Sequence, residues 1–110
     1  MKFALVYAYD PVQAGPGHGE IDEWVALDAA LKAAGNFVHE SGFHPAGQAQ
    51  TVTVRDGQVQ VRAGAVIGAG ITVAGYIEVE VADEGTALSW AERVPTARYG
   101  QVEVRRIVEY

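Results

Sequence analysis

Three histidines are the side chains of this sequence best suited to proton transfer near neutral pH. His39 and His44 share one short segment with Glu40, and His18 lies in a glycine-rich stretch before the first predicted helix. On a regular strand His39 points away from both Glu40 and His44, so the group converges only if Gly42 introduces a bulge. The histidines therefore fit either proton-transfer groups or ordinary polar positions, and we expect no metal site.

Two later strands are predicted to carry a second polar group. Tyr76 and Glu78 share one face of the first of these strands, and Glu103 and Arg105 share one face of the last. An arginine among carboxylates can hold an anionic ligand, or it can pair with a glutamate across the strands. Together with the histidines, these residues define a candidate site for a small carboxylate or enolic ligand. The candidate catalytic residues are His39 and His18, and the candidate substrate-binding residues are Tyr76, Glu78, Arg105 and His44.

The composition argues against several classes of function. The 110 residues suit one domain spanning 1–110, and no window reaches the roughly 18 uninterrupted apolar residues of a membrane span. Without cysteine the chain has no disulfide and no thiolate zinc site, and a net charge of −6 argues against nucleic-acid binding. The first residues lack the apolar core of a signal peptide, which favours a cytoplasmic protein. The glycines of AGAVIGAG precede a strand and not a helix, so we expect no dinucleotide and no other cofactor.

Hydrophobic periodicity and turn residues predict the elements that position these groups. The strongest local signal is Asp56-Gly57 between two alternating runs, which predicts a hairpin with Val54 opposite Val59. The predicted order is strand 2–9, loop 10–19, helix from 20 to a cap at 35, strand 36–44, hairpin 51–62, loose connection 63–70, strand 71–81, helix 83–95 and strand 101–110.

Both helices and the strand between them have a predicted buried side. On the first helix Asp28 is expected to pair with Lys32, four residues further on. The predicted buried stripe of this helix consists of Trp24, Leu27, Leu31 and Ala34. The stripe of the second helix consists of Ala87, Trp90, Ala91 and Val94, and Asp83 is expected to cap that helix. The predicted apolar face of strand 71–81 consists of Ile71, Val73, Ile77, Val79 and Val81.

This order corresponds to two split β-α-β units, so we expect an α+β fold with a ferredoxin-like sheet and an extra β-hairpin. Both helices then cover one face of the sheet. The second face would leave strand side chains in water, and two copies packed face to face would bury them. The sequence therefore predicts a homodimer, a dimeric α+β barrel that encloses a cavity.

The run from Leu31 to Arg105 resembles the YCII-related family, in particular its DGPF-domain branch. The resemblance rests on the order and spacing of several short motifs, none of which is specific alone. It implies the dimeric α+β barrel reached above. The matching positions are Leu31, Ala33, Ala34 and Gly35; Ser41, Gly42, Phe43, His44 and Pro45; the hairpin from Thr51 to Val59; Gly75 and Tyr76; Ala87, Trp90 and Ala91; and Pro95, Gly100, Glu103, Val104 and Arg105.

The chain departs from that family where the DGPF motif itself should stand. Ala63, Gly64, Ala65 and Val66 take its place, and the Glu/Lys-rich stretch that follows is replaced by Gly68, Ala69, Gly70 and Ile71. Arg106 replaces the proline of the family's EVRP ending. If the charged residues of that loop serve the family's activity, this chain has lost or changed it.

Two functions from different classes fit these residues. The first is a cofactor-free lyase, isomerase or cyclase that uses a histidine for proton transfer on a carboxylate or enolic substrate. The second is a non-catalytic module of the sigma-factor-associated regulatory type, which binds a ligand or a partner protein. The loss of charge between residues 63 and 71 favours the second, and the fold class decides nothing between them.

Overall fold

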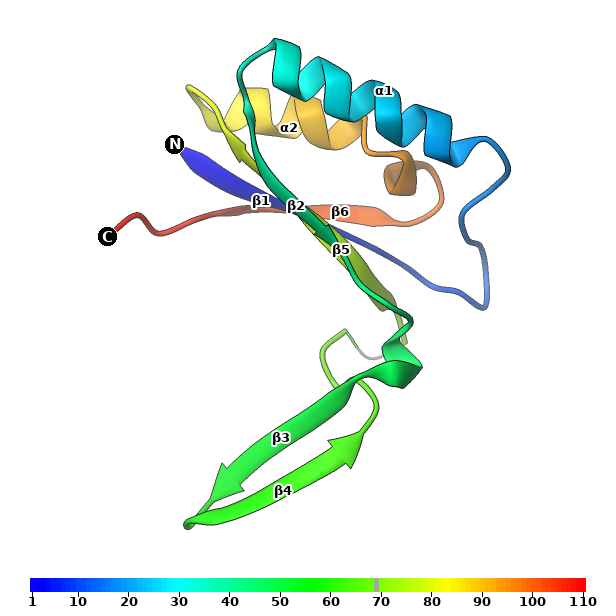
Figure 1. The fold of residues 1–110 in the computed structure, drawn as a ribbon, viewed down its shortest axis with the longest axis vertical. Helices are drawn as coiled ribbons and strands as arrows, with labels where there is room; N and C mark the ends of the chain where they lie inside the picture. Colours follow the sequence, from blue (N-terminus) through cyan, green and yellow to red (C-terminus); the bar gives the residue numbers. More distant parts are fainter. Residues whose placement is uncertain (69) are drawn as a thin grey trace.

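The computed structural model describes residues 1–68 and 70–110, so Ala69 of the predicted connection lies outside the described residues. Figure 1 shows the arrangement of the elements. In chain order they are β1 (Lys2–Tyr9), α1 (Glu20–Ala33), β2 (Phe37–Gly42), the 3-10 turn η1 (Ala46–Gln48), β3 (Gln50–Arg55), β4 (Gln58–Ala63), β5 (Thr72–Glu80), α2 (Glu84–Glu92), the 3-10 turn η2 (Pro95–Arg98) and β6 (Gln101–Arg106).

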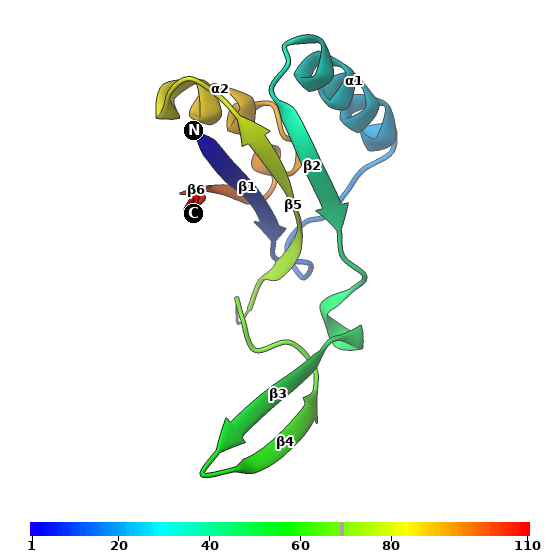
Figure 2. The same ribbon diagram turned by 60° about the vertical axis from the view of Figure 1, so that its left-hand side comes forward.

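Four strands form one antiparallel sheet in the order β2-β5-β1-β6. Both α1 and α2 cover one face of this sheet, and the opposite face is open (Figures 1 and 2). The predicted α+β class is therefore confirmed. A single chain has an open sheet and not a closed barrel, because β2 and β6 are free edges at its two sides. Neither helix of the described residues is long and apolar enough to cross a membrane.

Both helices begin, and α1 ends, at their predicted signals, but α2 ends at Glu92, before Pro95, which instead begins η2. Acidic side chains occupy the first turn of α1, and Gly35, at φ 73°, takes the left-handed conformation that ends a helix. At α2 the Oδ1 atom of Asp83 accepts hydrogen bonds from the backbone N–H and the hydroxyl of Thr86, both at 2.8 Å. These bonds hold the pKa of the Asp83 carboxyl below its usual value. Ala34, predicted in the buried stripe, is exposed because the helix stops at Ala33.

The core lies between the helices and the sheet. Odd-numbered residues of β1 meet alternate residues of β5 and the inner sides of α1 and α2 there. Leu5, Leu31, Ile77 and Val79 are fully buried, and Trp24 and Trp90 pack at the edge of the core, half-buried. Most of the predicted stripes are thus confirmed.

Two irregularities change which face of the sheet a residue occupies. The pairing of β2 with β5 skips Val38, so the bulge lies there and not at Gly42, which pairs regularly with Gly75. The pairing of β1 with β5 skips Ala74, so Val73 pairs with Ala8. Since a shift of one residue reverses the side chains, Val73 lies on the open face. Its prediction on the apolar face was wrong.

The hairpin of β3 and β4 is confirmed with its predicted register, Val54 opposite Val59 and Val52 opposite Val61. It forms a separate two-stranded sheet that extends away from the rest of the chain, on the open side of the four-stranded sheet (Figures 1 and 2). The radius of gyration of 15.7 Å reflects this extension, since a compact chain of this length has about 13 Å.

Candidate functional site on the open face of the sheet

One row of residues crosses the open face from one edge of the sheet to the other. His39 pairs with Glu78, Glu78 with Ala4, and Ala4 with Arg105. Directly paired residues lie on the same face, and the neighbouring Leu5 is buried under the helices. His39, Glu78 and Arg105 therefore share the face away from the helices. The bulge at Val38 brings His39 there, because it shifts the phase of β2 by one residue.

The next row places Tyr76 beside the histidine. Ser41 pairs with Tyr76, and Tyr76 with Val6. The hydroxyl of Ser41 lies 3.1 Å from Nε2 of His39, and the rings of His39 and Tyr76 are 5.9 Å apart between centroids. The hydrogen bond to Ser41 orients the imidazole and leaves Nδ1 for exchange with a bound molecule.

Arg105 stands at the other side of this face in a loose ion pair. Its Nη1 atom lies 3.9 Å from Oε2 of Glu103, with 71% and 67% of the two side chains exposed. A pair this open to water contributes little to stability, so it competes weakly with an anionic ligand. Neighbouring strands lie about 4.8 Å apart, which puts the backbones of His39 and Arg105 about 14 Å apart. A ligand that contacts both must lie between them, over Ala4 and Val6.

His44 lies at the rim of this face, beyond Tyr76. It lines a hollow of ≈ 260 Å³ together with Phe43, Ile67 and Val73. The Phe43 ring is 6.2 Å from the Tyr76 ring between centroids, so the hollow adjoins the polar rows. A larger hollow of ≈ 360 Å³ beside the loop after β1 has small and apolar lining residues, and Asp10 is the ionisable residue among them. This hollow therefore offers fewer ionisable groups for binding or catalysis than the polar rows do.

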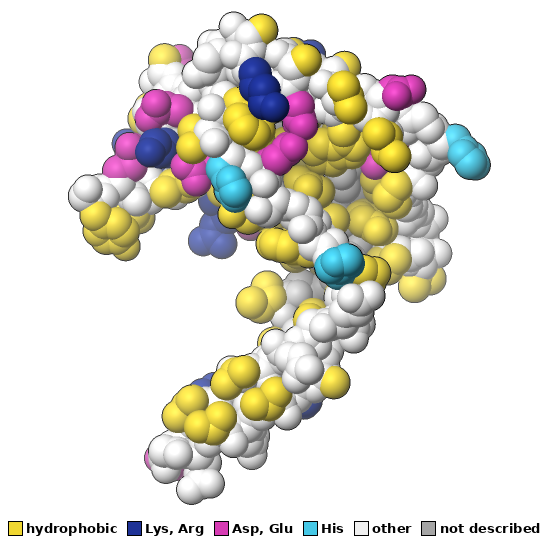
Figure 3. All heavy atoms as spheres, viewed as in Figure 1, with side chains coloured by type: hydrophobic (Ala, Val, Ile, Leu, Met, Phe, Trp, Pro, Cys, Tyr) yellow, Lys and Arg dark blue, Asp and Glu magenta, His cyan; other side chains and the backbone are white. Residues whose placement is uncertain are grey.

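His18 does not join the others. It is exposed in the loop directly before α1, whereas the polar rows lie on the sheet face away from the helices. The histidine side chains stand apart from one another in Figure 3. The described residues contain no group of three or more His, Asp or Glu side chains that could hold a metal ion. The structure thus places His39, Tyr76, Glu78 and Arg105 on one face of the sheet, with His39 and Arg105 on its two edge strands and His44 at the rim.

A second group of ionisable side chains lies between the sheet and α1. Glu40 pairs with Ile77 and so faces the helices. Burial raises the pKa of the Glu40 carboxyl to about 7, assisted by a hydrogen bond with Asp28 and by its charge, while Lys32 acts in the opposite direction. Burial, and then the charges of Glu40 and Asp28, raise the pKa of the Tyr7 hydroxyl to about 12. Folding therefore favours the protonated form of the Glu40 carboxyl.

The sequence-based interpretation missed this group, because it paired Asp28 with Lys32. In the structure the ammonium group of Lys32 lies over the ring of Phe37, 4.9 Å from its centroid. The Oδ1 atom of Asp28 is buried without a hydrogen-bond partner in the described part of the chain. Glu40 and His39 are neighbours on one strand, so their side chains point to opposite faces of the sheet and one of the two must face the helices. This was the signal in the sequence that could have predicted the group.

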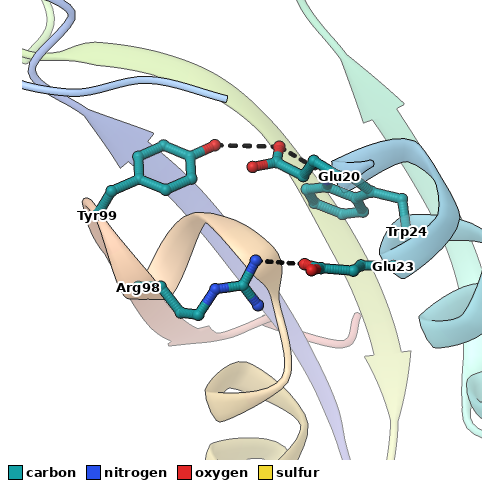
Figure 4. A network of polar contacts seen from close by, with 5 residues as sticks. All are labelled: Glu20, Glu23, Trp24, Arg98 and Tyr99. Carbon is teal, nitrogen blue, oxygen red and sulfur yellow. Dashed lines mark hydrogen bonds and ion pairs between the residues drawn. The ribbon is translucent and has the colours of Figure 1, made fainter. Parts of the chain in front are cut away.

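A third polar network joins the start of α1 to η2 (Figure 4). Oε2 of Glu20, a residue only 9% exposed, accepts hydrogen bonds from Nε1 of Trp24 at 3.2 Å and from the hydroxyl of Tyr99 at 3.1 Å. Arg98 pairs with Glu23 beside it. The carboxylate and its two donors satisfy one another, so this network holds the helix in place.

Comparison with known proteins gives one family. The family described as YCII-related domain matches residues 1–110, the whole length of the sequence. No curated protein matches the chain significantly.

Proposed function

Because this chain belongs to the YCII-related family, we propose that the open face of its sheet binds a small carboxylate or enolic ligand between two copies of the chain. The observation that carries the proposal is the row of His39, Glu78 and Arg105 with Tyr76 beside it. The interleaved order of the two β-α-β units supports a ferredoxin-like sheet, and two such sheets facing each other would make the dimeric α+β barrel.

Each residue of the rows has a distinct role in this proposal. Arg105 binds the acidic group of the ligand, since its guanidinium can donate two parallel hydrogen bonds to a carboxylate. Tyr76 donates a hydrogen bond to an enolic or carbonyl oxygen, and Glu78 accepts one from a hydroxyl. His39, oriented by Ser41, moves the proton. Such a site needs no cofactor to run a lyase, isomerase or cyclase reaction through an enolate.

The size of the hollow supports a site that two copies complete. Ligand sites usually measure about 300 to 1,000 Å³ and bury most of the ligand. The hollow beside the polar rows measures ≈ 260 Å³ in one chain and is lined mainly by apolar side chains. A second copy over the open face would enlarge it and exclude water, which strengthens the hydrogen bonds to an anion.

Thermal unfolding in the presence of small carboxylates, phenols and lactones tests the binding site. A ligand at 100 times its Kd stabilises the folded state by about 2.7 kcal/mol, which raises the Tm by several degrees. We expect this shift for the wild type and its loss in Arg105→Ala. The matched control is Arg106→Ala, because Arg106 is the next residue of β6 and pairs with Phe3. Equal shifts in all three proteins would place the ligand elsewhere.

Hydrogen exchange of the bound ligand separates the enzyme from the binding module. For a 2-oxo acid that passes the thermal test, the wild type should exchange the proton next to the carbonyl with deuterium from D2O, followed by NMR. We expect His39→Gln to keep the thermal shift and to lose the exchange. Binding without exchange in the wild type would favour the non-catalytic module.

A further inference from the structure

The hairpin of β3 and β4 exposes an apolar face that nothing in the described chain covers. This valine face consists of Val52, Val54, Val59 and Val61, which are between 56% and 65% exposed. Two directly opposed cross-strand pairs, Val52 with Val61 and Val54 with Val59, make it continuous. The other side of the hairpin is polar, with Thr51, Thr53, Gln60 and Arg62. The hairpin therefore has one side built for burial and one built for water.

A two-stranded hairpin of this length is marginally stable in water unless it packs against something. The base of this one is held by the hydroxyl of Thr51, which donates to the carbonyl of Gly64 at 2.8 Å, and by the Gly64 N–H, which donates to the carbonyl of Ala49 at 2.7 Å. These bonds anchor one end only. The valine pairs lie further out along the strands, so their burial must come from another molecule.

The exposed area indicates how large that other contact is. The accessible surface of the chain is 7349 Å². A compact monomer of 11.7 kDa has about 5,900 Å², so the excess is about 1,500 Å². A stable interface buries about 800 Å² on each partner. The excess is thus sufficient for a full interface, and it arises because the hairpin and the open sheet face are both unpaired.

We propose that the valine face packs on a second copy of this chain, so that each hairpin is an arm that holds the dimer. A wide hollow separates the hairpin from the rest of the molecule (Figure 3), and six residues per strand give the arm a reach of about 20 Å. In a two-fold symmetric dimer the contact forms twice, because the arm of each copy packs on the other copy. The inference rests on the dimer of the proposed function and names the surface that holds it.

Sedimentation equilibrium over a dilution series tests the arm by comparing variants at two neighbouring residues, one on the valine face of the hairpin and one on its polar side. Val54→Lys puts a charge on the valine face, and Thr53→Lys puts the same charge on the polar side. We expect the wild type and Thr53→Lys to be dimers with similar Kd values. In Val54→Lys the dimer Kd should rise at least about 100-fold, since a buried valine is lost and a charge enters twice per dimer.

Val54→Thr serves as the second variant in case the lysine disturbs the hairpin, because threonine has nearly the shape of valine and forms strands well. We expect its dimer Kd to rise about tenfold. A monomeric wild type, a dimeric Val54→Lys, or equal dissociation of Val54→Lys and Thr53→Lys would each overturn the arm. If Val54→Lys remains a dimer and still binds a carboxylate through Arg105, the arm is contradicted and the proposed function is not. If the wild type is a dimer but binds no carboxylate, the proposed function is contradicted and the arm is not.

Discussion

Glu40 is the residue with the clearest consequence for stability. Its carboxyl is partly buried between α1 and the sheet beside Asp28, and burial first, then Asp28, raises its pKa to about 7. The charged groups that face it are Asp28 and Lys32 from α1, and Tyr7 faces it from β1. The folded state therefore favours the neutral, protonated form of Glu40, whereas the unfolded chain ionises it near pH 4.5.

The sign of the pH dependence follows from this difference. A group whose pKa is raised by folding contributes stability that is present below pH 4.5 and lost as the pH rises through about 7. The full shift would correspond to about 3 kcal/mol, and solvent screening of this partly exposed carboxyl lowers it to about 1 to 2 kcal/mol. We expect the free energy of unfolding, measured in urea, to fall by that amount between pH 5 and pH 8.

Glu40→Gln should remove this pH dependence, because glutamine keeps the hydrogen bond to Asp28 and cannot ionise. The matched control is Glu80→Gln, which replaces an exposed carboxylate three residues along β5 from Ile77, the partner of Glu40, and should leave the pH dependence as in the wild type. A Glu40→Gln protein whose stability falls as steeply as that of the wild type would show that another group titrates.

The direction of single side chains was only partly predictable from the sequence. Alternation on β5 and β6 correctly gave the common face of Tyr76 and Glu78 and that of Glu103 and Arg105, since these pairs span no irregularity. Alternation alone does not give the direction of His39, because that direction depends on a bulge. The bulge lies at Val38, a β-branched residue that gives no signal for one, so the sequence could not decide which of His39 and Glu40 faces the open side.

At the scale of the elements, β5 and β2 approach closely where two glycines are paired, Gly75 and Gly42. A Cβ atom at Gly75 would overlap both the hydroxyl of Tyr7 and the carbonyl oxygen of Ser41. A Cβ atom at Gly42 would meet the Tyr7 hydroxyl at 3.8 Å, an ordinary contact. The missing side chain at Gly75 therefore makes room for the tyrosine between the strands.

Gly75→Ala and Gly42→Ala should separate this packing effect from the general effect of a glycine in a strand. We expect Gly75→Ala to lower the free energy of unfolding by about 2 to 3 kcal/mol, because backbone atoms of Ser41 cannot move aside easily. Gly42→Ala should change it by less than about 1 kcal/mol in either direction. Chemical denaturation measures both, and equal losses would mean that the strands shift to accommodate the methyl group.

Elements with local signals were predicted well. The Asp56-Gly57 turn gave the hairpin register, and the caps at Asp83 and Gly35 gave the helix ends, because each depends on neighbours in the sequence. Val73 was assigned to the wrong face because the bulge at Ala74 arises from the pairing of β5 with β1, two strands far apart in the chain. The network around Glu20 was missed for the same reason, since Tyr99 lies 79 residues further along.

At the scale of the whole molecule, the order of elements predicted an open sheet with both helices on one side, which is what the chain forms. The sequence could not give the direction in which the hairpin leaves the sheet, because the connection from Ala63 to Ile71 has no periodic pattern to orient it. Because the hairpin extends away from the sheet, a hollow lies between the arm and the open face of the sheet. The proposed ligand site therefore requires a second copy of the chain that fills this hollow and covers the polar rows.

Labelling of a thiol at Ala4→Cys tests this central claim most directly, because the chain has no cysteine of its own and Ala4 lies between Glu78 and Arg105 in the polar row. We predict that the labelling rate falls as the protein concentration rises through the dimer Kd, and falls further with a carboxylate that stabilises the wild type. A single rate at every concentration, unchanged by the carboxylate, would contradict the account.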